Sequence, residues 1–367
     1  MGINKRLTWW EPEFGEKEAK AAYEVVKSGY VNEGKVSIKL SNEIKKLLKV
    51  NFAITAPNGT LSLFLALKAV GVGIGDEVII PSLSFIATAS AVTLVGAKPV
   101  FCEISNDDCN ILPEKIKSLI SNKTKAIIPV HINGRNANLK EIMNIAKIYG
   151  ISVVEDAAQA LGSKFQEESL GTIANVGVIS LAPTKIITSG QGGLILTNDQ
   201  KLYDTIIKLK DHGRLIRSWN YHPEIGFNFK YNDILAAIAL VQLKKLSERL
   251  NKAKIDYTQY SEGLEEINEI EFFKTNFEDG NVPLWVDIKF EGNRERFIEY
   301  MDSKNITCRP FWPPIHTQKG YEKFCKAQQF PNTEKIASKS LWLPSGPGKT
   351  KLDIEKVIKE VKRYFKK

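Results

Sequence analysis

Short apolar runs alternate with helical patterns between about residues 50 and 200. The helical patterns include SLFLALKAV, an Ala-rich stretch through Val95 and the amphipathic LKEIMNIAKIYG. Helices that alternate with apolar strands form crossover connections and cover both faces of a parallel sheet. The pattern therefore predicts one large α/β domain with a mostly parallel sheet. Its predicted strands read FAIT (52–55), DEVIIP (76–81), PVFCEI (99–104), KAIIPV (125–130), ISVVED (151–156), VGVISL (176–181) and GGLILT (192–197).

The pattern changes in the last third of the chain. A helix that starts near Asp233 carries ILAAIALVQLKKL and is long enough to connect two domains. A strand-like VPLWVDIKF, a helix ERFIEYMDSKN, an aromatic–proline segment RPFWPPIH and a terminal amphipathic helix follow. This α+β pattern predicts a smaller C-terminal domain over residues 250–367, after a large domain over residues 1–249.

The charge balance is basic, with 51 Lys and Arg against 42 Asp and Glu and a net charge of +9 over 367 residues. A basic protein invites a nucleic-acid interpretation. The basic residues are scattered, however, and their one local excess, between Lys351 and Lys367, lies among apolar residues at helical spacing. The solvated face of a terminal helix explains this excess better than a DNA-binding arm, so we expect no nucleic-acid partner.

The four cysteines (Cys102, Cys109, Cys308 and Cys325) form no CxxC pair and have no histidine at zinc-finger spacing. They predict reduced thiols and no metal site. The N-terminus lacks the apolar core of a secretory signal, and the longest uncharged run, Val78 to Ala97, contains proline, glycine and several hydroxyl residues. We therefore expect a cytoplasmic protein without a membrane span.

Candidate chemistry lies where strands end, because ligands of an open parallel sheet collect beyond the carboxyl ends of its strands. Asn58-Gly59-Thr60 follows the first strand and opens a helix, a place where free N–H groups bind phosphate. An ordinary N-cap turn explains the same residues. Asp156 ends the strand ISVVED, where a buried carboxylate needs a cationic or hydrogen-bonding partner, although it is equally typical of a helix N-cap.

Lys185 lies in SLAPTKIITSGQGG, between two predicted strands and before a Gly-rich turn. A lysine amine in a site of low polarity loses its proton and forms an imine, whereas most loop lysines only face solvent. Ser180 ends the preceding strand and either binds a phosphate or caps a turn. A phosphate cradle, a buried acid and a lysine in a Gly-flanked loop are together the parts that pyridoxal phosphate requires.

The sequence resembles the DegT/DnrJ/StrS sugar aminotransferases, pyridoxal-phosphate enzymes of fold type I, the fold of aspartate aminotransferase. The resemblance runs over nearly the whole chain, and its most specific parts are EDAAQA and the Ser–Lys–Gly-rich stretch that follows. It also includes SGYVNEGKVS, NGTLSLFLAL, GDEVIIPSLSF, PVHINGR, GFNFKYNDILAAIALVQL and RPFWPPIH.

The resemblance implies a role for each matching residue. Lys185 is expected to form the Schiff base and shuttle protons, and Asp156 to pair with the pyridine nitrogen. Further cofactor contacts are implied for Gln159 near the ring hydroxyl, for Gly59, Thr60 and Ser180 at the phosphate, and for Phe85 stacked on the ring, where a core aromatic is the alternative. Asn228 matches a residue that reaches the cofactor phosphate of the neighbouring subunit, which implies a homodimer with its active site at the interface. Arg309 and His316 match a segment near the sugar substrate.

Two departures from relatives are visible: Ile179-Ser180-Leu181 replaces Phe-Ser-Phe, and Gln191 stands where glutamate is common. A lysine at position 185, rather than the histidine of a dehydratase branch, favours transamination. The implied substrates are L-glutamate and a nucleotide-linked 4-keto-6-deoxy sugar, with a 3-keto sugar nucleotide as the alternative. A DNA-binding regulator and a catalytically silent scaffold of the same fold are the rival functions.

Overall fold

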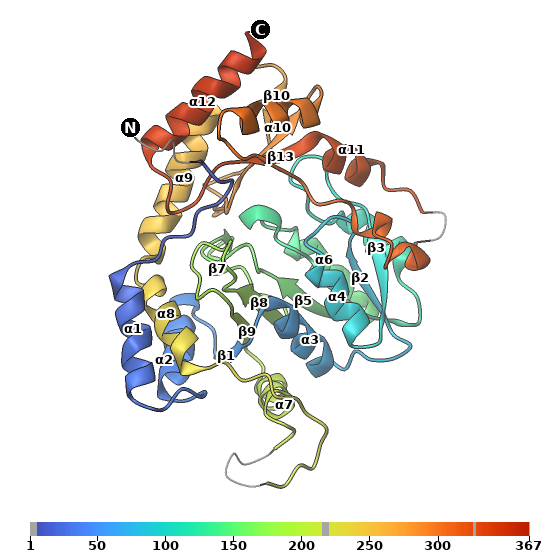
Figure 1. Ribbon diagram of the computed structural model, residues 1–367. Helices are drawn as coiled ribbons and strands as arrows, with labels where there is room; N and C mark the ends of the chain where they lie inside the picture. Colours follow the sequence, from blue (N-terminus) through green and yellow to red (C-terminus); the bar gives the residue numbers. More distant parts are fainter. Residues whose placement is uncertain (1–5, 215–219, 326–327, 367) are drawn as a thin grey trace.

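The computed structural model describes residues 6–214, 220–325 and 328–366. Its centre is a seven-stranded sheet in the order β1-β9-β8-β5-β4-β2-β3, in which β9 alone among these strands runs antiparallel to its neighbours (Figure 1). The strands are β1 (Phe52–Ala56), β2 (Glu77–Pro81), β3 (Lys98–Cys102), β4 (Thr124–Ile127), β5 (Ser152–Asp156), β8 (Val176–Ser180) and β9 (Gly193–Thr197). The mostly parallel α/β sheet expected from the sequence is confirmed.

Alternate residues of each central strand enter different hydrophobic clusters, so helices cover both faces of this sheet. On β2, Val78 packs with α3 and α4, whereas Ile79 packs with α5 and α6. Strand β5 repeats this division with Val154 and Val153, as the two-residue period of a strand requires. The helices of this part are α1 (Glu16–Lys27), α2 (Lys35–Leu48), α3 (Gly59–Ala69), α4 (Ala87–Leu94), α5 (Pro113–Leu119), α6 (Leu139–Tyr149), α7 (Gln200–Lys210) and α8 (Asp233–Leu243).

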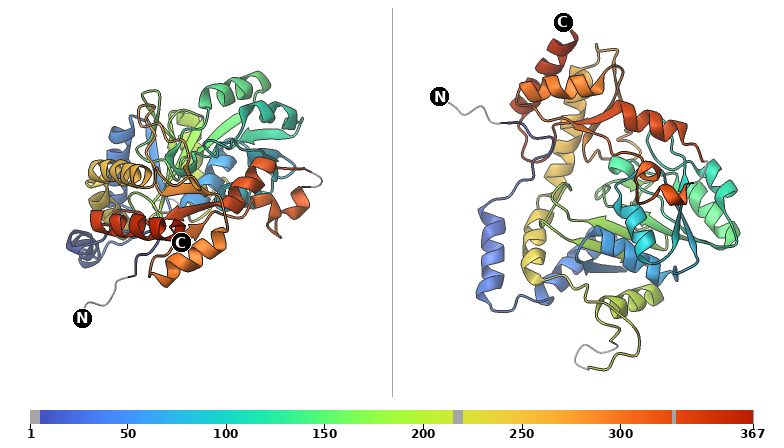
Figure 2. Two further views of the ribbon diagram at one scale, coloured as in Figure 1. Left: turned by 90° about the horizontal axis from the view of Figure 1, so that it is seen from above. Right: turned by 45° about the vertical axis from the view of Figure 1, so that its right-hand side comes forward.

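The C-terminal part forms a second, four-stranded antiparallel sheet in the order β10-β11-β13-β12 at one end of the molecule (Figure 2). Helices α9, α10 and α12 pack on it around a separate hydrophobic cluster. The elements are α9 (Leu246–Gly263), β10 (Ile270–Phe272), β11 (Val286–Phe290), α10 (Arg294–Ser303), β12 (Arg309–Pro310), α11 (Pro331–Lys339), β13 (Ser340–Leu343) and α12 (Lys351–Phe365). A short hairpin, β6 (Lys164–Phe165) and β7 (Glu168–Ser169), lies apart from both sheets.

The long helix expected after Asp233 is divided in two, because α8 ends at Leu243 and α9 begins at Leu246. At the break, the ammonium group of Lys245 contacts Glu18 of α1 at 2.9 Å. The predicted domain boundary, between residues 249 and 250, falls inside α9. Residues Leu7 to Trp10 reach the second sheet, where Leu7 and Trp10 form isolated bridges with Ile306 and Ser345.

A buried ion pair joins the two sheets. The guanidinium of Arg135 donates to both carboxylate oxygens of Asp287, at 3.0 and 2.8 Å, and both side chains are almost fully buried. Its Nε also donates to the carbonyl of Asp108 at 2.9 Å. A buried pair of this kind is held by geometry, because either charge left alone in the interior is costly.

We expect Arg135→Met to lower the free energy of unfolding by about 3–5 kcal/mol, because it leaves the Asp287 carboxylate buried without a countercharge. Chemical denaturation measures this loss. Lys98→Met, which breaks an exposed pair with Glu77, is the matched control, and exposed pairs contribute about 0–1 kcal/mol. Equal losses for the two variants would contradict a bracing role for the buried pair.

Candidate active site

A cavity of about 180 Å³ lies at the carboxyl ends of β1, β5 and β8 and reaches the second sheet. Most of the site residues predicted from the sequence line it: Gly59, Thr60, Phe85, Asp156, Gln159, Ser180, Lys185 and Arg309. The strand order explains this convergence, since parallel strands end at the same edge of a sheet. His316 and Asn228 are outside this set.

The amino end of α3 forms one wall of the cavity. Asn58 caps this helix, and its side chain accepts a hydrogen bond from the N–H of Leu61 at 2.9 Å. Within the part of the chain that the structure describes, the N–H groups of Gly59 and Thr60 have no partner. A Cβ on Gly59 would lie 3.2 Å from the Cβ of Ser180, so glycine permits the helix to approach that strand end closely. These groups form a ready anion site.

Asp156 is the last residue of β5 and is buried. Its carboxylate accepts hydrogen bonds from the hydroxyl of Thr88 at 2.8 Å and from the N–H of Ala158 at 3.2 Å. Desolvation raises the pKa of the carboxyl, and these hydrogen bonds and the charge of Lys185 only partly oppose that rise. It forms no ion pair with any described residue. A buried carboxylate in this state favours a cationic partner.

Lys185 lies in the loop between β8 and β9, and its ammonium group is 5.1 Å from the ring centroid of Trp285. Desolvation lowers the pKa of Lys185 from 10.5 to about 8, although the charge of Asp156 acts in the opposite direction. The amine is therefore half deprotonated near pH 8. That is the state in which it acts as a nucleophile or a base.

The loop that follows β4 fixes the orientation of the Gln159 amide. Its Oε1 accepts a hydrogen bond from the N–H of Asn133 at 2.9 Å, so its NH₂ group remains to donate to a ligand. Asn133 has a φ of 54° and also pairs with the main chain of Trp285, with distances of 2.8 and 2.6 Å. Asn133 thus connects Gln159 to Trp285, whose ring lies beside Lys185.

Phe85, in the loop after β2, is 50% exposed although it lines the cavity. Its ring meets the edge of Trp312 with the centroids 6.4 Å apart. A core aromatic would be buried, so the alternative considered for Phe85 does not describe its environment. An aromatic face presented to a cavity is suited to stacking on a planar ligand.

His316 and Asn228 lie away from the cavity of their own chain. His316 is 8% exposed and packs against Phe330, with the centroids 4.5 Å apart, and its Nε2 is 3.4 Å from Glu334. Asn228 is exposed and forms a bridge with Asp211 near the end of α7. Neither residue contributes to the cavity within one chain.

The sequence interpretation did not single out the tryptophans that line the cavity: Trp9, Trp285, Trp312 and Trp342. Trp285 lies in the predicted strand VPLWVDIKF and Trp312 in the aromatic–proline segment, and the four rings meet only through tertiary packing. It also missed Thr88, the hydroxyl partner of Asp156, although a threonine in an otherwise Ala-rich helix was a usable signal.

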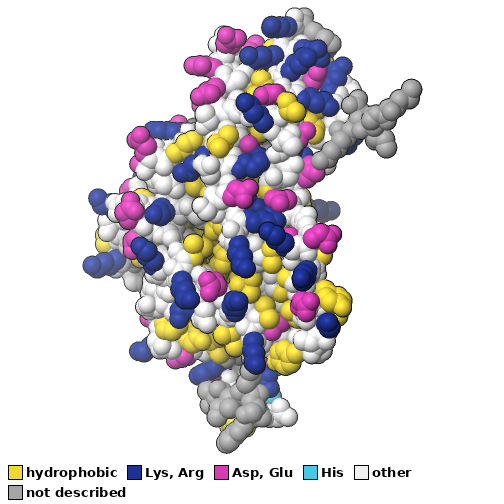
Figure 3. Space-filling model, turned by 90° about the vertical axis from the view of Figure 1, so that its left-hand side faces the viewer, with side chains coloured by type: hydrophobic (Ala, Val, Ile, Leu, Met, Phe, Trp, Pro, Cys, Tyr) yellow, Lys and Arg dark blue, Asp and Glu magenta, His cyan; other side chains and the backbone are white. Residues whose placement is uncertain are grey.

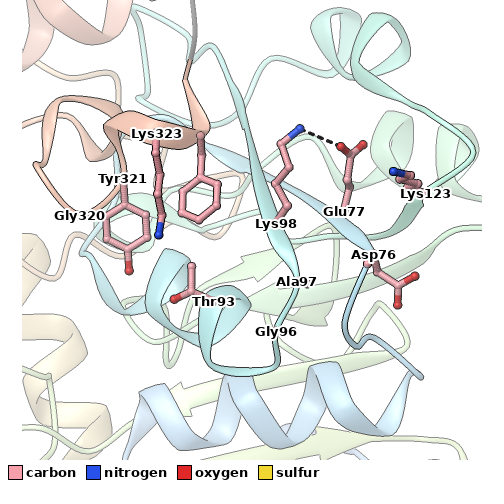
Figure 4. Close-up of a pocket in the computed structure, with 12 residues that line it drawn as sticks. Asp76, Glu77, Thr93, Gly96, Ala97, Lys98, Lys123, Gly320, Tyr321 and Lys323 are labelled. Carbon is pink, nitrogen blue, oxygen red and sulfur yellow. Dashed lines mark hydrogen bonds and ion pairs between the residues drawn. The ribbon is translucent and has the colours of Figure 1, made fainter.

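A larger open depression, about 680 Å³, lies at the opposite edge of the sheet (Figure 4). It is lined by residues at the amino ends of strands, among them Glu77 and Lys98, which pair with each other at 2.9 Å. Helix and loop residues, including Thr93, Tyr321 and Lys323, form its other side. Because ligands of parallel sheets bind at the carboxyl ends, this depression is not the candidate site.

The residues of the smaller cavity fit pyridoxal phosphate, the group expected from the sequence. Gly59, Thr60 and Ser180 offer unpaired N–H groups and a hydroxyl to a phosphate. Asp156 offers a buried negative charge to a protonated ring nitrogen, and Lys185 offers a desolvated amine to an aldehyde. Across the described ranges, no cluster of His, Cys, Asp and Glu side chains is arranged to hold a metal ion, and no helix is both long and apolar enough to cross a membrane.

We expect the amine of Lys185 to titrate near pH 8 in protein freed of any bound ligand. Reductive methylation at a series of pH values, followed by peptide mass spectrometry, measures the free-amine fraction at each lysine. The peptide with Lys185 should reach half of its full modification near pH 8, whereas an ordinary solvated lysine does so near about pH 10.4. Asp156→Asn should lower the Lys185 midpoint further, because it removes a charge that raises this pKa. A midpoint at the ordinary lysine value would show that the amine is solvated.

The chain is similar to known proteins over nearly its whole length. Residues 12–362 match the model of the DegT/DnrJ/EryC1/StrS aminotransferase family. The chain is 30% identical to the GDP-perosamine synthase of Vibrio cholerae, over 97% of this chain and 98% of that protein. It is likewise 30% identical to the spore coat polysaccharide biosynthesis protein SpsC of Bacillus subtilis, over 99% and 98% of the two chains. The structure of PseC, an aminotransferase of pseudaminic acid biosynthesis from Helicobacter pylori, superposes with a TM-score of 0.93 at 25% identity, covering 99% of this chain and 100% of that chain. The chain therefore belongs to the DegT/DnrJ/EryC1/StrS aminotransferase family.

Proposed function

We propose that this enzyme uses pyridoxal phosphate to transfer the amino group of L-glutamate to the keto group of a nucleotide-linked 4-keto-6-deoxy sugar. The observation that carries the proposal is the desolvated amine of Lys185 in one cavity with the buried carboxylate of Asp156. Similarity to GDP-perosamine synthases from two bacteria supports the 4-keto sugar as the acceptor. A 3-keto sugar nucleotide is the alternative acceptor.

Residues of the cavity would hold the cofactor at its phosphate, at two atoms of its ring and on the face of the ring. The N–H groups of Gly59 and Thr60, with the hydroxyl of Ser180, would bind its phosphate, and Asp156 would bind its ring nitrogen. The NH₂ group of Gln159 would donate to the ring oxygen, and Phe85 would stack on the ring. When bound, the cofactor supplies a ring that withdraws electrons from the substrate carbon next to the transferred nitrogen.

Lys185 has two tasks in this reaction. Its neutral amine would hold the cofactor at the aldehyde carbon, and the same amine, when free, would carry a proton to and from the substrate carbon. A base is most effective when its pKa is close to the working pH, and a pKa of about 8 meets that condition. The indole of Trp285, 5.1 Å from the ammonium group, restricts where this side chain can move.

A dimer would complete the site. Hydrophobic side chains are exposed on α1 and α2, namely Tyr23, Val26, Ile38 and Leu47. These helices lie on the left of Figure 1, and Figure 3 shows hydrophobic side chains gathered between lysines on that face. A groove between α2, β1 and α7 adjoins them. Apolar surface of this kind favours a protein partner, and a second copy would bring Asn228 to the neighbouring cofactor phosphate.

The rival functions have less support from the described surface. A DNA-binding regulator needs a concentrated basic patch, whereas many lysines and arginines here pair with nearby carboxylates, as in Lys245 with Glu18. A silent scaffold would not need a desolvated lysine beside a buried acid. A cofactor absorbance band separates the scaffold from an enzyme, and sequence-specific DNA binding at physiological salt would favour the regulator.

Purified protein should carry a visible cofactor band that L-glutamate removes, because transfer of the amino group leaves the cofactor as an amine without the conjugated C=N bond. Lys185→Ala should lose both the band and at least a thousandfold in turnover, since nucleophile and proton carrier are removed together. Absorbance and product mass spectrometry, with a panel of 4-keto and 3-keto sugar nucleotides, measure these effects. Lys147→Ala, on the exposed face of α6, is the control. Normal turnover by Lys185→Ala would refute the site.

Mixed dimers test whether Asn228 acts across the interface. If it binds the partner's cofactor phosphate, Lys185→Ala and Asn228→Ala chains exchanged into one dimer form one intact site, with wild-type Lys185 and Asn228 from different chains. Activity should then rise on mixing to about a quarter of the wild-type value, as random pairing in a two-fold dimer predicts. Activity that stays at the sum of the separate variants would contradict the cross-subunit role.

A further inference from the structure

Arg309 stands out as a cation in the cavity that no carboxylate neutralises. It lies on β12, and its guanidinium carbon is 4.7 Å from the ring centroid of Trp9 and 5.7 Å from that of Trp342. No side-chain hydrogen bond or ion pair to Arg309 occurs among residues 6–214, 220–325 and 328–366. The guanidinium of Arg135, by contrast, donates hydrogen bonds to both carboxylate oxygens of Asp287.

The rings of Trp9 and Trp342 hold the guanidinium of Arg309 in place but accept no N–H···O or N–H···N hydrogen bond from it. Cation–π contact with an indole attracts the charge and orients the plane, but it accepts none of the five N–H bonds. Burial lowers the pKa of Arg309, which shows that the group is partly desolvated. A partly desolvated cation fixed in orientation and lacking an acceptor is prepared for an anion that arrives from outside.

A second donor beside Arg309 also lacks an acceptor. Trp342 is 1% exposed and lines the same cavity, and its indole N–H is buried without a hydrogen-bond partner. Two other indoles of this region are satisfied, because Trp285 donates to the carbonyl of Thr184 at 3.1 Å and Trp10 to that of Pro183 at 2.9 Å. Arg309 and Trp342 are paired across β12 and β13, so the two unsatisfied donors come from adjacent strands.

The position of this pair relative to Lys185 separates it from the reacting amine. Lys185 lies over the ring of Trp285, which contacts Trp342 with the centroids 5.5 Å apart, and Trp342 in turn contacts Arg309. The phosphate cradle of Gly59 is on α3, on the other side of the cavity. An anion at Arg309 would therefore belong to a substrate and not to the cofactor phosphate.

We propose that Arg309 and Trp342 form an oxyanion subsite that binds a carboxylate or phosphate group of the substrate. This inference rests on the proposed function, which supplies both sources: the carboxylates of glutamate and the diphosphate of the nucleotide-linked sugar. The planar guanidinium matches the two oxygens of either group, and the indole N–H adds a further donor. Arg309 thereby selects substrates that carry an anionic group at a fixed distance from the reacting centre.

Calorimetric titration of the cofactor-loaded enzyme with non-reacting probes tests the subsite. Glutarate represents the carboxylate source, and GDP and dTDP represent the phosphate source. Arg309→Gln should weaken at least one class of probe by about 10- to 100-fold, the range for a charge-assisted hydrogen bond. Trp342→Phe, which keeps a ring but removes the N–H, should weaken the same probe by about 2- to 10-fold.

Matched variants separate the possible results. Arg296→Gln removes one charge from the exposed face of α10 and should leave both affinities unchanged. Arg309→Lys keeps the charge but loses the planar fork, and serves if Arg309→Gln unfolds on thermal denaturation. If only glutarate binding weakens, the subsite binds the carboxylate of the donor. If only nucleotide binding weakens, it binds the phosphate of the sugar nucleotide. If both weaken, the two substrates share the subsite.

Two results overturn the subsite. One is a wild-type enzyme that binds none of the three probes, and the other is Arg309 variants that all bind within about threefold of wild type, a difference too small for a lost charge-assisted bond. Removal of the visible band by L-glutamate, measured in the same preparations, reports on the proposed function independently. A wild-type enzyme without that band refutes the transaminase, whereas an active wild type with unaffected variants refutes only the subsite.

Discussion

The removal of one amine and one carboxylate from water, in a common cavity, is the constraint on which the rest of the site depends. Desolvation raises the pKa of Asp156 and lowers that of Lys185, so burial moves both groups towards their neutral forms. Val153 and Val154 of the same strand are fully buried in the core, and their burial offsets part of this cost. A ligand that brings a ring cation to Asp156 and an electrophilic carbon to Lys185 would restore the stabilising interactions that these two groups lose when they leave water. The site is therefore complementary to its cofactor before the cofactor binds.

The second sheet supplies one wall of this cavity, and buried contacts fix the position of that wall. Asn133, held in the left-handed region, connects Gln159 on the large sheet's side to the main chain of Trp285. The buried pair of Arg135 and Asp287 joins the same two parts a few residues away. Because these contacts are buried and bidentate, the indole wall has a fixed position relative to Lys185. The proposed substrate subsite and the proposed proton carrier thus lie in one rigid frame, which favours precise positioning of the reacting groups.

The sequence predicts the positions of the candidate site residues where these depend on local order along the chain. Gly59, Asp156 and Ser180 follow or end strands whose apolar patterns are clear, and strand ends converge in any parallel sheet. Lys185 was recognisable from its Gly-flanked loop and from the resemblance of the surrounding motifs. The strands themselves were also predicted, since each is a short apolar run bounded by turn residues.

The aromatic wall could not be predicted in the same way. Trp9, Trp285 and Trp342 come from three distant segments; Trp285 and Trp342 have the burial of core residues, and Trp9 is half-buried against them. Only tertiary packing reveals that they face a cavity together and that the N–H of Trp342 is left unpaired. The break between α8 and α9 was missed for a related reason, because Lys245 pairs with Glu13, just before α1, and with Glu18 of α1, both far away in sequence. Local patterns carry no information on such distant contacts.

A crystal structure of the protein grown with pyridoxal phosphate tests the central claim most directly. The account predicts continuous density between the side-chain nitrogen of Lys185 and the cofactor, with a carboxylate oxygen of Asp156 about 2.6–2.9 Å from the ring nitrogen, as in a charge-assisted hydrogen bond. A cofactor linked to another lysine, or one whose ring nitrogen faces away from Asp156, would contradict it.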